Sequence, residues 1–396
     1  MKRLFIYNSD IKLSSNNNRL LFTEKDFHPC TPFFLTHNIL PDSIDIIYSK
    51  GVFEVTPYIR EVIKRIDDLL VVGGILEIEH FIHGSIYSAG QLFRPMSFTM
   101  YEISLCLGNR YLLIEKDLLE TKCILKYRKV KSSILVSDTI YNWSFGIISD
   151  GKKNERVLQI IHQISEFSIP NYEVLICGPF PYNHTTISSN VKVIGDSDLY
   201  KDLRAPISAK KNRIIDNANF NNLVIMHDRI SFPSNWFEKI KGYGNYFDVL
   251  QPQILDEESK SRQVQDWMYF SGDFSDFSNT KGGYVEYNKW NSSIYIDGGL
   301  IIIKKHVIEN VRYNENLNWG EAEDLDLCRR LYLSGALFSF YHDLKVFTST
   351  HRHPGRPLNQ KKRTLIRMFI SRIIRGFINS YKGENLFHDF LSKSNN

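Results

Sequence analysis

The fold of this chain is decided by the segment Phe145-Gly146-Ile147-Ile148-Ser149-Asp150-Gly151. Its apolar run predicts a buried strand that ends in polar and glycine residues. A helical pattern follows over residues 154–167, and a second strand is predicted over residues 172–178. Strand, helix and strand in this order are typical of the beginning of a parallel α/β sheet. Nucleotides bind at the carboxyl ends of such strands.

Length and composition are those of an ordinary globular protein with two domains. The 396 residues are 43% hydrophobic and 23% charged, with a formal net charge of +5. Much of this excess lies near the C-terminus, so we expect a local basic patch and no nucleic-acid partner. The five cysteines show no metal-ligand spacing, which argues against structural zinc and disulfides. No apolar run reaches the ~18 residues of a membrane span and no signal sequence is present, which favours the cytoplasm.

A further apolar run, residues 223–226, ends in His227-Asp228-Arg229. Asp228 therefore lies where a buried strand is expected to reach the surface. A carboxylate in that position can hold the divalent cation that neutralises a diphosphate leaving group. Considered alone, the same residue can equally well cap a turn.

The most informative stretch reads Trp319-Gly320-Glu321-Ala322-Glu323-Asp324-Leu325-Asp326-Leu327-Cys328-Arg329-Arg330-Leu331. Spacings of three and four place Asp324, Leu327 and Leu331 on one face of a helix that ends at Ser334-Gly335. Such a helix can bury its leucines while its first turn presents carboxylates to a cleft. The alternative is that these acids only stabilise the helix N-terminus, where negative charge is favourable.

In this order, the Asp228 turn, a Gly298-Gly299 turn before an apolar strand and the Glu323-Asp324 pair resemble the active site of family 2-type GT-A glycosyltransferases. The resemblance covers residues 143–355. It implies a Rossmann-like domain that transfers a sugar from a nucleotide-diphosphate donor to a glycan acceptor, as in surface polysaccharide biosynthesis.

The resemblance also implies roles on the acceptor side. Asp324 is the expected general base of an inverting displacement, which needs a carboxylate within reach of the acceptor hydroxyl. Glu323 is expected to hold another acceptor hydroxyl. The remaining acceptor positions implied by the resemblance are Trp319, Gly298 and Gly299.

The metal position departs from the family pattern. The family turn usually reads Asp-x-Asp, and the match places Asp228 on the metal-binding aspartate and Met226 in place of the first acid. Either His227 joins the metal ligands, or Arg229 supplies part of the positive charge directly. The implied cofactor is Mn²⁺ or Mg²⁺.

Other donor and metal contacts follow from the resemblance alone. Asp150 matches a position that contacts the base or ribose, and Gly178 matches the turn after the second strand. Lys211-Asn212 matches a basic residue and asparagine near the base and phosphates. A histidine beyond the acidic helix often completes the metal site, with His351 as first choice here and His353 as second.

Residues 41–130 resemble the C-terminal half of a class I SAM methyltransferase, with a strand at 44–48, a helix at 58–70, a Gly73-Gly74 turn and a closing hairpin. That family cradles its cofactor in a glycine-rich turn after the first strand, whereas residues 1–40 contain no glycine. We therefore expect residues 1–140 to form a truncated, non-catalytic α/β domain that does not bind SAM. An active methyltransferase remains the alternative.

The C-terminal residues 358–396 are predicted to be a basic tail behind a catalytic domain at 141–357. Residues 361–382 hold seven basic residues and no acid, and their apolar residues share one helical face. Such a helix either lies on an anionic membrane surface or docks on the catalytic domain. The first reading places the protein on the inner face of the cell membrane with a lipid-linked glycan acceptor. A catalytically silent membrane scaffold is the second alternative function.

Overall fold

The computed structural model describes residues 2–7, 20–81, 87–88, 91–92, 95–132, 138–181, 188–195, 206–262, 266–271, 281–317 and 321–349. Contacts divide the chain into two compact units, Met1–Tyr269 with Tyr284–Arg352 and Phe270–Gly283 with His353–Asn396. Most of the second unit, including the predicted basic tail, lies outside the described residues.

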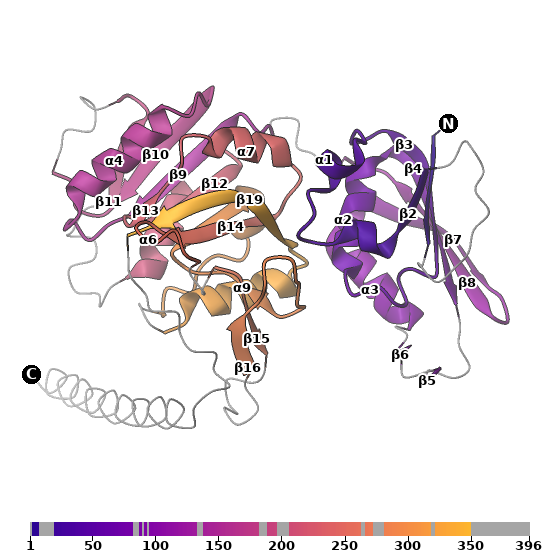
Figure 1. Ribbon diagram of the computed structural model, residues 1–396. Helices are drawn as coiled ribbons and strands as arrows, with labels where there is room; N and C mark the ends of the chain where they lie inside the picture. The colour runs from indigo at the N-terminus through magenta and orange to yellow at the C-terminus, as the bar shows by residue number, and fades with distance from the viewer. Residues whose placement is uncertain are drawn as a thin grey trace, which may run out of the picture. The chain divides into compact units, whose positions relative to one another are not determined.

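The N-terminal part of the chain forms a six-stranded sheet in the order β2-β1-β3-β4-β8-β7 (Figure 1). Strands β2, β1, β3 and β4 are parallel, and β8 is antiparallel to both β4 and β7. The strands of this part are β1 Arg3–Tyr7, β2 Leu20–Thr23, β3 Ile44–Lys50, β4 Leu70–Phe81, β5 Tyr87–Ser88, β6 Gln91–Leu92, β7 Tyr111–Leu118 and β8 Lys122–Lys129. Of these, β5 and β6 form a separate two-stranded sheet. The helices are η1 Glu24–Phe27, α1 Phe33–His37, α2 Ile59–Leu69, α3 Met96–Leu107 and η2 Gly108–Arg110.

Helix α2 shows why this part folds as the periodicity predicts. Its apolar residues Val62, Ile63, Ile66 and Leu69 recur at spacings of three and four and are all buried. The predicted strand, helix and strand are confirmed as β3, α2 and β4, and the predicted hairpin is confirmed as β7 and β8. The predicted Gly73-Gly74 turn is wrong, because β4 begins at Leu70 and both glycines lie within it. The methyltransferase resemblance stays a prediction, because the turn that follows β1 lies outside the described residues.

The second part forms an eight-stranded mixed sheet in the order β11-β10-β9-β12-β18-β14-β19-β13. Strands β11, β10, β9 and β12 are parallel, and β18 is antiparallel to both β12 and β14. This parallel, Rossmann-like half confirms the predicted α/β fold class and is the arrangement expected of a GT-A-like domain. The strands of this part are β9 Asn142–Ile148, β10 Asn171–Cys177, β11 Val191–Gly195, β12 Asn222–His227, β13 Ile230–Ser231, β14 Val249–Asp256, β15 Met268–Ser271, β16 Lys281–Tyr284, β17 Ile294–Tyr295, β18 Leu300–Lys304 and β19 Phe338–Thr348. Of these, β15, β16 and β17 form a separate three-stranded sheet.

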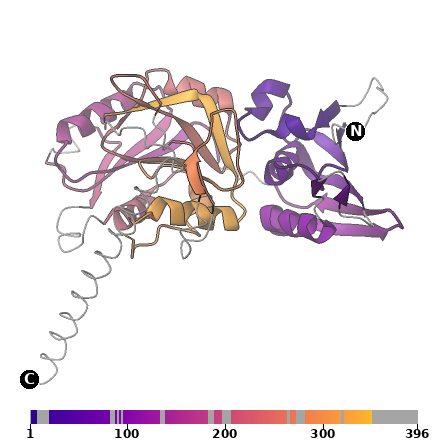
Figure 2. The same ribbon diagram turned by 60° about the horizontal axis from the view of Figure 1, so that its bottom comes forward.

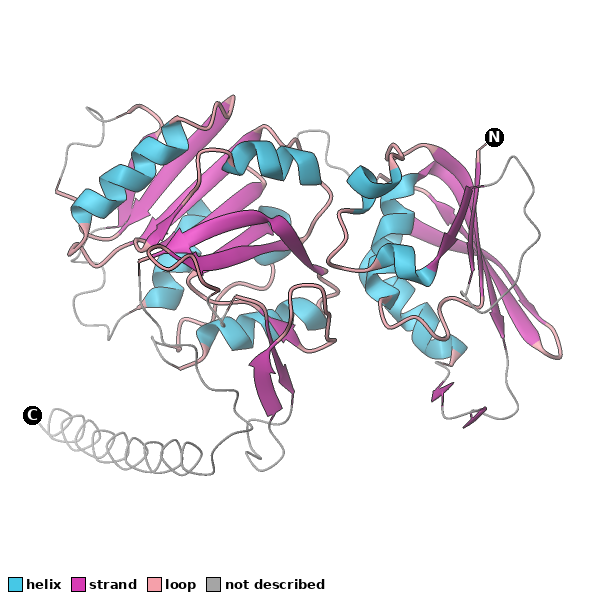
Figure 3. Ribbon diagram, in the orientation of Figure 1, coloured by secondary structure: helices cyan, strands magenta, loops and turns pink. Residues whose placement is uncertain are grey.

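Helices cover both faces of this sheet (Figure 1 and Figure 2). Because both faces of the sheet are buried, the parallel strands have continuous apolar sequences, and these apolar runs allowed the strands to be predicted. Helices α4 Asn154–Ser165 and α7 Trp236–Tyr243 pack on one face, and α6 Ile207–Asn217 and α9 Glu323–Leu333 pack on the other. Helix α8 Lys305–Ile308 follows β18 directly. Figure 3 distinguishes these helices from the strands they cover, and none of the helices in the described ranges is long and apolar enough to span a membrane.

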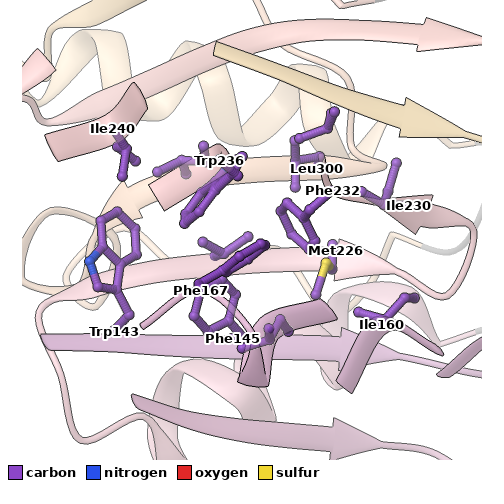
Figure 4. Close-up of a cluster of buried hydrophobic side chains, with 14 of the residues drawn as sticks. Trp143, Phe145, Ile160, Phe167, Met226, Ile230, Phe232, Trp236, Ile240 and Leu300 are labelled. Carbon is purple, nitrogen blue, oxygen red and sulfur yellow. The ribbon is translucent and has the colours of Figure 1, made fainter. Parts of the chain in front are cut away.

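An aromatic cluster fills the space between the sheet and the α4 and α7 layer (Figure 4). The ring of Trp236 lies 5.4 Å from that of Trp143 and 5.7 Å from that of Phe145, measured between centroids. Phe167 stacks on Trp236 at 5.5 Å. Met226, the penultimate residue of β12, is fully buried in the same cluster. The carboxyl end of β12 is therefore fixed by packing up to the residue before His227.

Gly146 provides a test of the packing between β9 and α6. A Cβ at this position would overlap Cγ2 of Ile214, which is itself fully buried and cannot move aside freely. We expect Gly146→Ala to lower the free energy of unfolding by about 1–3 kcal/mol through overpacking. Urea denaturation followed by circular dichroism measures the change.

The matched control is Gly242→Ala in α7, where the nearest atom to an added Cβ is Tyr341 Oη at 4.0 Å. Alanine favours the helix by roughly 0.5–1 kcal/mol over glycine, so this variant should be as stable as the wild type or more stable. Equal destabilisation by both substitutions would contradict the proposed packing.

Candidate active site

The carboxyl ends of three parallel strands meet at one edge of the large sheet. Ile148 at the end of β9 is in register with Cys177 of β10 on one side and His227 of β12 on the other. The residues that follow these ends therefore lie close together. They include four of the predicted donor positions, namely Asp150, Gly178, Asp228 and Arg229.

Asp228 is anchored directly to the end of β9. Its carboxylate accepts a hydrogen bond from Ser149 Oγ at 2.9 Å, and its backbone N–H donates to Ile148 O at 3.3 Å. Burial raises the pKa of Asp228, although the Ser149 hydrogen bond and the positive charges of Lys153 and Arg229 act in the opposite direction. The carboxylate is thus held in a partly dehydrated position at the strand ends.

Asp150 has a different environment. Its side chain is 58% exposed, and its carboxylate lies 3.2 Å from Lys152 Nζ. Burial opposes ionisation, but the Lys152 backbone N–H, the Lys152 ammonium and Lys210 together outweigh it and lower the pKa of Asp150. Its predicted contact with the base or ribose stays a prediction.

Lys210 is a site residue that the sequence did not single out. Its Nζ donates to Ser149 O at 2.6 Å and would lie 3.4 Å from a Cβ placed on Gly178. Gly178 has φ +140°, and an added Cβ would overlap Ser149 O, so only glycine fits this turn. Burial lowers the pKa of Lys210, while nearby negative charges including Asp228 partly offset this effect. The ammonium therefore lies between the ends of β9 and β10.

The predicted donor residues Lys211 and Asn212 contact the acidic segment. Lys211 is fully buried, with its Nζ 3.3 Å from Glu323 Oε1 and 4.7 Å from the centre of the Tyr313 ring. Asn212 donates to Tyr313 O at 2.9 Å and to Glu315 Oε1 at 2.8 Å, and it accepts from Tyr313 N. Their role toward the donor stays a prediction, and their observed contacts fix the loop that leads to α9.

Helix α9 carries the predicted catalytic acids in its first turn. Leu327 and Leu331 are buried as predicted, and the helix ends before Gly335. Asp324 Oδ2 accepts from Gly298 N at 3.0 Å. A Cβ on Gly298 would lie 3.0 Å from Asp324 Cβ and 3.1 Å from Glu323 Oε1, so this backbone approach requires a minimal side chain.

The turn of residues 297–299 connects the two halves of the predicted site. Arg229 Nη2 lies 3.7 Å from Asp297 Oδ2, and both side chains are mostly buried. His227 N donates to Gly299 O at 3.0 Å. A Cβ on Gly299 would lie 2.5 Å from Arg229 Nη2, so the guanidinium packs against the backbone of Gly299. The Asp228 turn and the acids of α9 therefore flank the same short segment.

The residues of the Asp228 turn do not fit a two-carboxylate metal site. Met226, in the position of the first acid, packs in the hydrophobic core (Figure 4), which leaves Asp228 as the sole carboxylate of the turn. Over the part of the chain that the structure describes, no three His, Cys, Asp or Glu side chains are arranged to hold a metal ion. The predicted ligands His351 and His353 lie outside the described residues, as does Trp319.

Comparison with known proteins gives solved structures only. No protein-family model matches the chain, and no curated protein matches it. Similar solved structures include S. aureus TarS residues 1–349, with 12% identity over 52% of this chain and 60% of that one at a TM-score of 0.37. The S. aureus TarS structure aligns at 12% identity over 53% and 37% of the two chains, with a TM-score of 0.36. The complex of TarS 1–349 with UDP-GlcNAc aligns at 11% identity over 56% and 61%, with a TM-score of 0.38. The chain thus spans less than two thirds of each of these structures.

The buried pair Lys211–Glu323 makes a stability prediction. Replacing Lys211 by Met leaves the Glu323 carboxylate buried without its cation, and we expect a loss of about 3–5 kcal/mol in the free energy of unfolding. The double variant Lys211→Met/Glu323→Gln removes both charges and should recover part of that loss. Urea denaturation at neutral pH measures all three proteins.

Lys241–Glu238 on α7 serves as the control, because its side chains are 31% and 68% exposed and 2.7 Å apart. Lys241→Met should change stability by about 0.5 kcal/mol or less. If Lys211→Met were equally mild, Lys211 would not be the counter-ion of Glu323.

Proposed function

We propose that this protein is an inverting glycosyltransferase that moves a sugar from a nucleotide-diphosphate donor to a glycan acceptor. The observation that carries the proposal is the shared turn of residues 297–299. Asp297 lies beside Arg229 on the donor side, and the next residue, Gly298, binds the carboxylate of Asp324 on the other side. A sugar bound over this turn would have the strand ends at its leaving group and α9 at its acceptor.

Asp324 is proposed to act as the general base. The hydrogen bond from Gly298 N to Oδ2 orients the carboxylate against the turn. In the reaction the carboxylate takes the proton of an acceptor hydroxyl, and the acceptor oxygen forms a bond to the anomeric carbon. The bond from that carbon to the diphosphate breaks, and its electron pair leaves with the nucleoside diphosphate. Attack from the face opposite the leaving group inverts the anomeric centre.

Glu323 is proposed to position the acceptor. One of its oxygens is held near the Lys211 ammonium, which fixes the direction of the carboxylate. An ionised carboxylate accepts hydrogen bonds only, so it would select a hydroxyl of the acceptor sugar. The two consecutive acids would then have separate tasks, one in proton transfer and one in orientation.

The acceptor class and the location follow from the sequence resemblance. We propose a growing surface glycan, free or lipid-linked, with the protein acting on the cytoplasmic face of the membrane. The basic residues 361–382 would supply the contact with anionic lipid. No step of the proposed reaction depends on a metal ion.

Asp324→Asn tests the proposed base. The amide cannot accept the proton, so transfer should fall about 100-fold or more, while binding of the nucleotide sugar persists. A panel of nucleotide sugars and glycan acceptors is screened by release of nucleoside diphosphate, and donor binding is measured by isothermal titration calorimetry.

Asp326→Asn is the matched control in the same helical turn. Asp326 pairs with Arg330 at the helix surface, so the variant should stay within about threefold of wild-type activity. Loss of donor binding in Asp324→Asn would mean that its role is misassigned. A wild-type protein without transfer or hydrolysis of any nucleotide sugar would favour a silent scaffold, and binding of SAM would favour a methyltransferase.

A further inference from the structure

Positively charged side chains surround the only acid of the Asp228 turn. Lys210 reaches Ser149 O, and Ser149 Oγ in turn donates to Asp228. Arg229 follows Asp228 in the sequence, and its guanidinium packs against the backbone of Gly299. Lys153 also acts electrostatically on Asp228. Two further acids lie near these cations, because Asp150 acts on Asp228 and Asp297 pairs with Arg229. These cations come from α6, from the end of β12 and from the residue before α4, so three separate elements direct positive charge to the same strand ends.

This arrangement is unfavourable for a divalent cation. A metal on a diphosphate needs acidic or neutral oxygen ligands, and adjacent ammonium and guanidinium groups repel it. The turn offers one carboxylate, because Met226 occupies the position of the other and packs in the core. The same cations are suited to a diphosphate, since lysine and arginine form charge-assisted hydrogen bonds to phosphate oxygens.

We propose that Lys210 and Arg229 bind the donor diphosphate directly and provide the charge neutralisation that a divalent cation supplies in transferases with two turn carboxylates. This inference rests on the proposed glycosyltransferase function and names the chemistry of its donor site. Asp228 then acts as a positioning residue, because it holds Ser149, whose carbonyl oxygen holds Lys210.

The geometry gives Lys210 an advantage over its neighbours. Its ammonium is partly dehydrated by burial, so an anion that arrives at the strand ends replaces lost hydration. The ammonium also lies beside the turn at Gly178, whose Cβ position would be 3.4 Å from Nζ. Lys211, one residue later, is fully buried against Glu323 and is not required for this role.

The test measures binding of UDP, GDP, ADP and dTDP to the full chain by isothermal titration calorimetry, once with EDTA and once with MnCl₂. The tightest ligand of the wild type is then used for the variants. We expect the wild type to bind the nucleoside diphosphate as tightly in EDTA as in MnCl₂. Lys210→Met should weaken this binding about tenfold to a hundredfold, which is the contribution of one charge-assisted hydrogen bond. Arg229→Gln should weaken binding in the same direction, and Lys210→Arg should restore most of the affinity.

Asp228→Asn separates the two models of the site. The amide oxygen still accepts from Ser149 Oγ but carries no negative charge to repel an anion, so diphosphate binding should become tighter in the cation site. Lys241→Met, which removes one positive charge from α7, should leave binding unchanged. Thermal unfolding verifies that each variant is folded, and Lys210→Gln replaces Lys210→Met if the latter is not.

Three outcomes are decisive. Binding that survives EDTA and Asp228→Asn but fails in Lys210→Met supports the cation site. Binding that is lost in EDTA, restored by Mn²⁺ and abolished by Asp228→Asn overturns it and leaves the glycosyltransferase proposal intact. No binding of any nucleoside diphosphate to the wild type, with or without Mn²⁺, overturns both.

Discussion

The backbone of residues 297–299 is the constraint on which the site depends. Gly298 donates to Asp324, and Gly299 lies under Arg229 while its carbonyl accepts from His227. A Cβ on Gly298 would press against Asp324 and Glu323, and a Cβ on Gly299 would force the Arg229 and Asp297 side chains to shift. The pair of glycines therefore lets charged groups from distant parts of the chain contact one turn. Strand β18 begins directly after the turn and pairs with β12, so the packed sheet fixes the position of the turn.

The first turn of α9 shows how the structure opposes local preferences to place its acids. Ala322, immediately before the helix, has φ 62° and ψ 42°, a left-handed conformation that costs a non-glycine residue about 1–2 kcal/mol. The Asp324 contact with Gly298 and the Glu323 pair with Lys211 hold the next two residues in place. Strain of this kind persists only where the surrounding contacts determine the conformation, and here they determine the direction of two carboxylates.

The sequence predicted the layers of the fold well, because buried parallel strands and an amphipathic α9 leave clear apolar patterns. It predicted the site in part. Consecutive residues of a helix point about 100° apart, so Lys210 and Lys211 face different partners although they are neighbours in sequence. The packing of α6 on Gly146 and β10 decides which of the two lysines reaches the strand ends. This packing is a tertiary contact, and the local sequence does not predict it. The positive φ of Gly178 was likewise invisible.

The position of Met226 links the core to the chemistry of the site. A carboxylate there would be surrounded by the aromatic cluster of Trp236 and Phe232, where an isolated charge is strongly unfavourable. Met226 stabilises the end of β12 by packing in this cluster. Because Met226 is apolar, Asp228 is the single acid of the turn, and Ser149 donates a hydrogen bond to it. Positive charge can then approach Asp228 without competing with a metal, and Lys210 and Arg229 do so from two different elements.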